Sequence, residues 1–269
     1  MADHRLPPDH QPLPSSPGAA PRIGVWAVGE DQAIRRRARA LAAELGCPIV
    51  AGDATNCELL LVVALDGLEL RAAGRGAPRG IRVDWCAGGA ARHRLATASR
   101  RQPLARAVGL KKGPRAVIDA TTGLGRDALW LATLGCPVVA IERSPVLGVM
   151  LRDAWERLEP GPVRQRLRLR IGDAADVLTA LAPRERPAVV YLDPMFPPRG
   201  KTAKPKKEMC ILRRLVGDDA DASTLVAVAR RVARERVVVK RTPRAPPLAP
   251  DPSLTIRSKL VRFDVYLTS

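Results

Sequence analysis

The stretch Val117-Ile-Asp-Ala-Thr-Thr-Gly-Leu-Gly-Arg-Asp-Ala128 decides the fold of this 269-residue chain. Its aliphatic start predicts a buried strand, and residues 126–134 have the apolar spacing of a helix. Between them, Gly123 and Gly125 allow a sharp turn and a close approach of the backbone to a ligand. The first N–H groups of a helix have no partner within it, so they would face that ligand. The stretch therefore predicts a nucleotide-type binding loop.

Two carboxylates accompany this loop. Glu142 follows Gly123 by nineteen residues and ends the next apolar run, at 137–142. A carboxylate placed there can accept hydrogen bonds from both ribose hydroxyls of an adenosine. Asp119 either holds the loop or contacts the amino group of the ligand, and a plain turn residue is the alternative. The G-x-G-x-x-A pattern of the loop also occurs in NAD sites, so the pattern alone leaves the cofactor open.

Strands and helices alternate from residue 116 onward. Continuous aliphatic strands that alternate with helices predict a doubly wound, mostly parallel sheet of the Rossmann-like α/β class. Two final runs, 254–258 and 262–267, suit an antiparallel pair at the edge of this sheet. We expect strands at 116–120, 137–142, 168–171, 188–192 and 236–240, and helices at 126–134, 145–158, 175–181 and 222–234.

Composition divides the chain into three parts. The first is rich in proline, which predicts disorder. The second begins with a strand at 23–28 and a helix at 32–45 that Gly46 ends. It closes with a connector, 92–115, that has eight Arg or Lys and no acid. The parts are a disordered tail (1–21), a small α/β subdomain with the basic connector (22–115), and the domain of the glycine loop (116–269).

A second motif, Asp193-Pro-Met-Phe196, follows the run 188–192, where ligands bind in open α/β sheets. It is similar to the D/N-P-P-Y/F signature of amino-group methyltransferases, with Met195 in place of the second proline. An exocyclic amine on a base is a poor nucleophile, so acceptors must hold its nitrogen toward an electrophilic methyl group. We expect Asp193 and the Pro194 carbonyl to accept from the amine, and Phe196 to stack on the base. An ordinary Asp-Pro turn is the alternative.

The charge favours a polyanionic partner, since 45 Lys and Arg face 27 Asp and Glu for a net charge of +18. An arginine-rich composition alone would give the same balance. Residues 199–214, directly after the second motif, hold seven cations and one anion. We expect this basic loop to hold RNA phosphates, and a solvated run of charge is the alternative. The cations concerned are Lys201, Lys204, Lys206, Lys207, Arg213 and Arg214.

Cysteine and histidine usage narrows the chemistry. The five cysteines are widely spaced and contain no C-x-x-C pair, so we expect neither a metal site nor a disulfide framework. The longest apolar run, 59–65, is too short to span a membrane, and the start does not resemble a signal peptide. We therefore expect a cytoplasmic protein without a membrane partner. Because His93 is the one histidine outside the tail, histidine-based general-base catalysis is disfavoured.

Together with the stretch 83–90, several segments resemble the ribosomal small-subunit methyltransferase J family in order and spacing. The resemblance extends over about residues 22–269. It is carried by Asp119-Ala-Thr-Thr-Gly-Leu-Gly-Arg-Asp127, Leu134-Gly-Cys136, Glu142-Arg-Ser-Pro145, Tyr191-Leu-Asp-Pro-Met-Phe-Pro197, Lys206-Lys-Glu-Met209, Val237-Val-Val-Lys-Arg241 and Arg262-Phe-Asp264.

The resemblance implies a class I methyltransferase in 116–269 that uses S-adenosylmethionine (SAM). It implies methylation of N2 of the guanosine at position 1516 of 16S ribosomal RNA, with that RNA or the small ribosomal subunit as partner. The family often has two small or hydroxylated residues where Asp173 and Ala174 stand, and its glycine-rich basic stretch is replaced at 96–101. Cofactor contacts carry over to Arg126, Asp127, Glu142, Arg143, Asp173, Ala174 and Asp193, beside Asp119, Gly123 and Gly125 of the loop.

Two alternatives remain. An NAD-dependent oxidoreductase would use the same glycine loop, but it lacks a suitable histidine and leaves Asp193–Phe196 unexplained. A non-catalytic RNA-binding protein on a methyltransferase fold is disfavoured by the intact Gly123, Gly125, Glu142 and Asp193.

Overall fold

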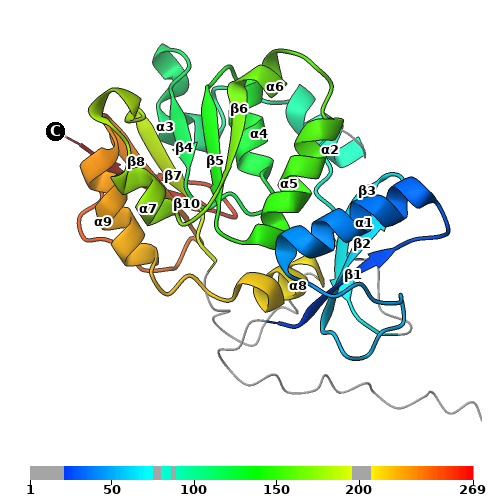
Figure 1. Cartoon of the computed structure of the whole chain (residues 1–269). Coiled ribbons are helices and arrows are strands. Elements are labelled where there is room, and N and C mark those ends of the chain that lie inside the picture. The colour runs from blue at the N-terminus through cyan, green and yellow to red at the C-terminus, as the bar shows by residue number, and fades with distance from the viewer. Residues whose placement is uncertain (1–20, 75–79, 86–88, 196–206, 269) are drawn as a thin grey trace, which may run out of the picture.

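The computed structural model describes residues 21–74, 80–85, 89–195 and 207–268, which form two sheets surrounded by helices (Figure 1). All but the last residue of the tail 1–21 lies outside these residues, so its disorder stays a prediction. The larger sheet has seven strands in the described part. In order they are β6 (Leu167–Ile171), β5 (Val138–Glu142), β4 (Val117–Asp119), β7 (Val189–Leu192), β8 (Arg236–Arg241), β10 (Arg262–Leu267) and β9 (Leu254–Arg257).

The direction of these strands confirms the doubly wound, mostly parallel sheet. Strands β6 through β8 are parallel to their neighbours, and β10 runs antiparallel to both β8 and β9. The antiparallel pair expected at the edge is thus confirmed. The chain adds β5 and β6 on one side of β4 and then returns to add β7 and β8 on the other. Strand order therefore reverses between β4 and β7, and ligands bind beyond the carboxyl ends of strands at such a point.

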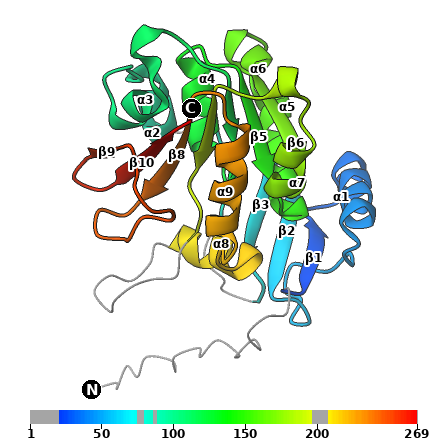
Figure 2. The ribbon, with the colours of Figure 1, turned by 90° about the vertical axis from the view of Figure 1, so that its left-hand side faces the viewer.

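Helices cover both faces of the large sheet, and consecutive strand residues bury alternate faces. In β7, Val189 and Tyr191 belong to one apolar cluster, whereas Val190 and Leu192 belong to another. The first cluster includes side chains of the third, fourth and fifth helices, and the second includes side chains of the seventh and ninth. Figure 2 shows the ninth helix in front of the sheet. Burial on both faces explains why the central strands β4, β5 and β7 consist largely of apolar residues.

Helix ends follow local capping signals. The side chain of Asp31 accepts from the N–H groups of Ala33 and Ile34, and Gly46 ends the helix in the left-handed conformation. None of the described helices is long and apolar enough to cross a lipid bilayer. The helices are α1 (Gln32–Leu45), α2 (Gly89–Ala96), α3 (Pro103–Val108), α4 (Arg126–Thr133), α5 (Pro145–Arg157), α6 (Pro162–Arg166), α7 (Ala174–Thr179), α8 (Lys207–Val216) and α9 (Ala222–Val232), with 3₁₀ turns at Leu110–Lys112 and Pro183–Glu185.

The smaller sheet consists of β1 (Ile23–Ala27), β2 (Leu59–Ala64) and β3 (Gly67–Ala72). Strand β1 pairs parallel with β2, and β2 pairs antiparallel with β3. A buried carboxylate, Asp153 of α5, joins this part to the large sheet. It accepts from the Leu68 N–H at 3.3 Å and forms ion pairs with Arg37 and Arg157. The two parts also share one continuous apolar cluster.

The sequence predicts that the basic run 199–214 is a loop. This prediction is wrong for the second half of the run. Residues 207–214 belong to α8, and 196–206 lie outside the described residues. Ile211 and Leu212 are buried, and Met209, Leu215 and Val216 pack against the core at helical spacing. The high charge of the run concealed this apolar face. The short helix α6 was also missed.

Candidate active site

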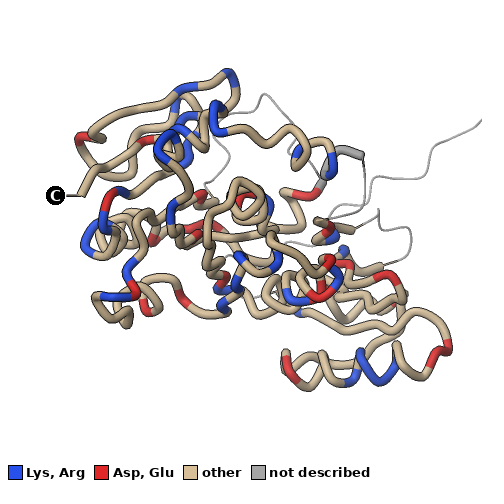
Figure 3. The backbone as a smooth tube through the Cα atoms, turned by 90° about the horizontal axis from the view of Figure 1, so that it is seen from above, with Lys and Arg blue, Asp and Glu red and all other residues tan. Residues whose placement is uncertain are grey.

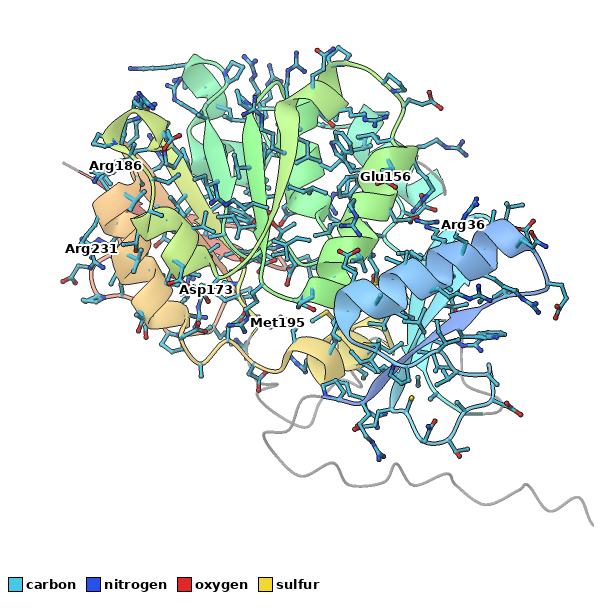
Figure 4. All side chains as sticks on the ribbon, viewed as in Figure 1. Arg36, Glu156, Asp173, Arg186, Met195 and Arg231 are labelled. Carbon is cyan, nitrogen blue, oxygen red and sulfur yellow. The ribbon has the colours of Figure 1, made fainter. Side chains whose placement is uncertain are left out.

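A cavity of about 400 Å³ lies at the carboxyl ends of β4, β5 and β7, where the strand order reverses. This volume is in the range of cofactor sites. Figure 4 shows Asp173 and Met195, both of which line the cavity, toward the same end of the large sheet. The structure brings together most residues expected at the site: Asp119, Gly123, Arg126, Asp127, Glu142, Arg143, Asp173, Ala174, Asp193 and Pro194 all line the cavity.

Both glycines of the loop are in the left-handed conformation, but they serve different purposes. Gly123 has φ 56° and lines the cavity. Gly125 has φ 70°, and a Cβ there would lie 2.6 Å from Cζ2 of Trp85. The Trp85 indole N–H also donates to the Leu124 carbonyl at 3.0 Å. Gly125 therefore permits close packing of Trp85 on the loop, a contact that the sequence reasoning missed.

Glu142, at the end of β5, holds the glycine loop in place through hydrogen bonds to backbone N–H groups. Its carboxylate accepts from the Gly123 N–H and from the Ser144 N–H, each at 2.8 Å. Burial raises the pKa of this carboxyl to about 7, and the two N–H groups oppose the rise. Each oxygen keeps a second lone pair, so the carboxylate can still accept from two ribose hydroxyls. Together with the open cavity, this arrangement fits an adenosine-containing cofactor.

Asp119, at the end of β4, is buried and accepts from the Thr121 N–H at 3.2 Å. Burial raises its pKa well above the usual range, and repulsion from Asp127 adds to the rise. The side chain thus holds the loop, and it also lines the cavity. Asp119 therefore holds the loop, as one interpretation of the sequence predicted. Its contact with the amino group of a ligand stays a prediction.

Asp173 is the N-cap of α7. Its Oδ1 accepts from the N–H groups of Ala175 and Asp176, at 2.8 and 3.3 Å. Within the described part of the chain, Oδ2 has no protein hydrogen bond, which leaves it for a ligand. Asp173 therefore caps α7 beside the cavity with one oxygen and leaves the other free of protein hydrogen bonds among the described residues.

The guanidinium groups of Arg126 and Arg143 pair with acids of the segment that runs from α8 to the start of α9. Arg126 pairs with Glu208 of α8. Arg143 pairs with Asp219 and, at 3.3 Å, with Asp221 at the start of α9. Sequence reasoning assigned these three acids no role: Glu208 lies in the run 199–214, which was predicted to be a basic loop, and Asp219 and Asp221 follow that run. The pairs join α8 and α9 to the ends of α4 and β5.

A cation and two carboxylates meet at the second motif. Lys240 Nζ, at the end of β8, donates to Asp193 Oδ2 at 2.7 Å and to Asp127 Oδ2 at 2.9 Å. The Tyr191 hydroxyl donates to Asp127 Oδ2 at 2.7 Å, and Arg94 of α2 donates to Asp127 Oδ1 at 2.5 Å. We call these five residues the Asp193 cluster. Among the described residues, no group of three or more His, Cys, Asp or Glu forms a metal site.

The backbone of the second motif is held from two sides. The Asp193 N–H donates to the Thr121 hydroxyl of the glycine loop at 2.6 Å. The Met195 N–H donates to Asp219 Oδ2 at 2.6 Å. The motif is therefore fixed to the same loop that Glu142 braces. Tyr191 and Lys240 lie in segments that carry the family resemblance, but the sequence assigned no site role to them or to Arg94.

The remaining expected residues do not join the cavity in the described structure. Phe196, Lys201, Lys204 and Lys206 lie outside the described residues, and Lys207 is described only as the start of α8. Arg214 pairs with Glu58 at 3.1 Å, and Arg213 lies 3.9 Å from Asp218. These two guanidinium groups are thus engaged by acids.

Comparisons with known proteins agree with this geometry. Residues 46–268 match the family described as "Putative SAM-dependent methyltransferase". Ribosomal RNA small subunit methyltransferase J of Thioalkalivibrio sulfidiphilus is 46% identical over 253 residues, covering 92% of this chain and 98% of that protein. The protein of the same name from Pseudomonas aeruginosa PAO1 is 42% identical, with coverages of 92% and 95%. The chain belongs to the ribosomal RNA small subunit methyltransferase J family.

A solved structure gives the same result for the fold. The crystal structure of a SAM-dependent methyltransferase from Neisseria gonorrhoeae is similar with a TM-score of 0.68 and 31% identity, covering 91% of this chain and 95% of that one. The protein is a SAM-dependent methyltransferase with a Rossmann-like class I fold, and SAM is its cofactor. Family membership does not favour an NAD-dependent oxidoreductase or a non-catalytic RNA-binding protein.

Proposed function

We propose that this protein methylates the exocyclic N2 of a guanosine in 16S ribosomal RNA, at position 1516 as the family resemblance implies. The relatives are named as methyltransferases of small-subunit ribosomal RNA. One observation supports the amino-group chemistry most directly. Asp193 lines the same cavity as the glycine loop and Glu142, and 41% of its side-chain surface is open there.

Residues of this chain would bring an unreactive amine into line. SAM, when bound, supplies an electrophilic methyl group on a sulfonium. Asp193 Oδ1 has no protein hydrogen bond among the described residues, so it is available to accept from an amine N–H. The Pro194 carbonyl would accept from the second N–H, and Phe196 would stack on the base. Transfer of the methyl group would leave the cofactor sulfur neutral and place positive charge on the amine nitrogen. The Asp193 carboxylate would stabilise that charge and would accept the proton that the methylated nitrogen then loses.

The cofactor half of the cavity has a matching assignment. Glu142 would accept from the ribose hydroxyls, and Asp173 Oδ2 would accept from the adenine amino group. Arg126, Asp127 and Arg143 line this region, although each is already paired with charged neighbours of the chain. We therefore assign these three residues to the shape and charge of the cavity wall, with direct contact to the cofactor remaining a prediction.

RNA phosphates would be held by cations of the basic run 199–214, which follows the second motif in the sequence. Lys and Arg recur over most of the described backbone (Figure 3), in keeping with the net charge of +18. The cations proposed for this contact are Lys201, Lys204, Lys206, Lys207, Arg213 and Arg214. Changing Lys206 and Lys207 to Glu should weaken RNA binding and reduce the slope of log K against log salt by about 2. An unchanged slope means that these lysines are only solvated.

The decisive experiment is mass spectrometry of 16S ribosomal RNA from a strain without the gene. Loss of one N2-methylguanosine, restored by the wild-type gene and not by Asp193→Ala, supports the proposal. Methyl transfer in vitro to deproteinised RNA and to small subunits from that strain would then identify the substrate. Retention of the N2-methyl group at position 1516 would refute the proposed target.

A further inference from the structure

Lys240 connects Asp193 of the second motif to Asp127 of α4. In the parallel register of β7 and β8, Leu192 is paired with Val239, so the next residues, Asp193 and Lys240, leave adjacent strand ends together. The ammonium lies 2.7 Å from Asp193 Oδ2 and 2.9 Å from Asp127 Oδ2. Only 24% of the Lys240 side chain is exposed. The contact is therefore built into the sheet.

The two carboxylates that Lys240 contacts are not equivalent. Both oxygens of Asp127 are occupied, Oδ2 by the Tyr191 hydroxyl and Lys240, and Oδ1 by Arg94. Within the described residues, Asp193 receives a side-chain hydrogen bond only from Lys240, and only at Oδ2. Asp127 thus anchors the ammonium, and the ammonium in turn holds one edge of Asp193.

We propose that Lys240 is a positioning residue: it holds Asp193 Oδ2, so that Oδ1 is presented, as an acceptor, to the amine that is methylated. This inference rests on the proposed function for the identity of the amine. Lys240 itself need not touch the substrate. Its removal should leave a carboxyl group that is free to rotate and is surrounded by other acids.

The charges around Asp193 explain why a cation is needed there. Burial raises the pKa of Asp193, and repulsion from Asp127 and Asp219 adds to the rise, whereas Lys240 opposes it. Asp119 lies nearby on β4, and repulsion from Asp193 adds to the rise in the pKa of Asp119. Arg94 acts on Asp127. A protonated Asp193 would have one oxygen that donates, so it would be a poorer acceptor for an amine N–H.

The first test uses the free protein, so it does not depend on RNA or on methyl transfer. The probe is the carboxyl ¹³C resonance of Asp193, assigned by its loss in Asp193→Asn. Lys240→Met should raise the pKa of Asp193 by about one to three pH units, the usual effect of an adjacent opposite charge. Tyr191→Phe is the matched control, because it removes one hydrogen bond from Asp127 but leaves the Lys240–Asp193 contact. An unchanged pKa in Lys240→Met overturns the proposal.

The second test measures single-turnover methyl transfer against pH, at saturating SAM and RNA. In Lys240→Met the acid limb should move to higher pH, which lowers the rate there by about 10- to 1,000-fold. Lys240→Arg should restore part of the rate, and thermal melting will report whether each variant folds. If Lys240→Met does not fold, the pH dependence of the transfer rate is compared between Lys240→Arg and Lys240→Gln instead.

A double-mutant cycle separates positioning from general damage. In the Asp193→Asn background, Lys240→Met should cost little further rate, since its effect passes through Asp193. An equal loss in both backgrounds overturns the proposal. A raised pKa in the first test combined with no methyl transfer by the wild-type enzyme would instead refute the proposed function.

Discussion

The glycine-loop half of the cavity and the Asp193 half are held by different kinds of interaction. The loop is held mainly by backbone N–H groups: Gly123 donates to Glu142, and Thr121 donates to Asp119. The Asp193 half is held by side-chain charges, with Lys240 between Asp127 and Asp193. The first half uses partners close in sequence, whereas the second collects residues from α2, α4, β7 and β8. A local motif can therefore specify the first half, but only the folded sheet creates the second.

The largest effect on the rate of methyl transfer is expected from Asp193→Ala, in the Asp193 half of the cavity. Loss of one preorganised acceptor typically costs about 2.7–4 kcal/mol, so single-turnover transfer at saturating SAM and RNA should fall by about 100- to 1,000-fold. Affinity for S-adenosylhomocysteine should change much less. Asp176→Ala, an acid of α7 that does not line the cavity, is the control. A rate close to wild type would reduce Asp193 to a turn residue.

Glu142→Ala should weaken cofactor binding more than it slows methyl transfer, which is the reverse of the effect expected for Asp193→Ala. The variant loses the acceptor for the ribose hydroxyls and the brace on Gly123, so cofactor binding should weaken by about 1.5–3 kcal/mol, or roughly 10- to 150-fold. Transfer at saturating cofactor should fall far less than in Asp193→Ala. Calorimetry with S-adenosylhomocysteine measures the first effect. Unaltered affinity would contradict the assignment of Glu142.

Cofactor affinity should also depend on pH through Glu142. Its pKa is raised to about 7 by burial, and ribose hydroxyls donate to the charged form. Binding therefore lowers this pKa and releases a proton, so affinity should fall as pH drops below 7, by at most about tenfold per pH unit. Above that pH the contribution of Glu142 is constant. Calorimetry in buffers of different ionisation enthalpy counts the protons, and Glu142→Gln should abolish the release.

The same contrast explains what the sequence could and could not predict. Helix α1 was predicted with its observed ends, and Gly46 was the local signal for where it stops. The strands of the large sheet were found from their aliphatic runs, and the cavity from the carboxyl ends of β4, β5 and β7. Lys240 was not assigned a role, because its meeting with Asp193 depends on β8 lying beside β7. Helix α8 was missed because its many cations suggested a basic loop, although its apolar residues have helical spacing.

One contact qualifies the local character of the glycine loop, because Trp85 reaches it from outside the large sheet. Its indole N–H donates to the Leu124 carbonyl at 3.0 Å, and its ring fills the space that Gly125 leaves. Trp85→Phe keeps an aromatic ring but removes the donor. The free energy of unfolding should fall by about 1–3 kcal/mol, since a buried carbonyl loses its partner.

The effect of Trp85→Phe on cofactor binding should be the smallest of the series, yet it decides whether Trp85 positions the loop. If it does, affinity for S-adenosylhomocysteine should fall by about 2- to 10-fold, the loss of one ordinary hydrogen bond. Trp155→Phe is a matched control, because the Trp155 indole donates to the Leu167 carbonyl at 3.1 Å and does not line the cavity. That variant should lose stability to a similar extent without losing affinity. Equal cofactor affinity in both variants would mean that Trp85 stabilises the fold alone, and that the glycine loop holds its shape through Glu142 and Asp119 without help from the N-terminal part of the chain.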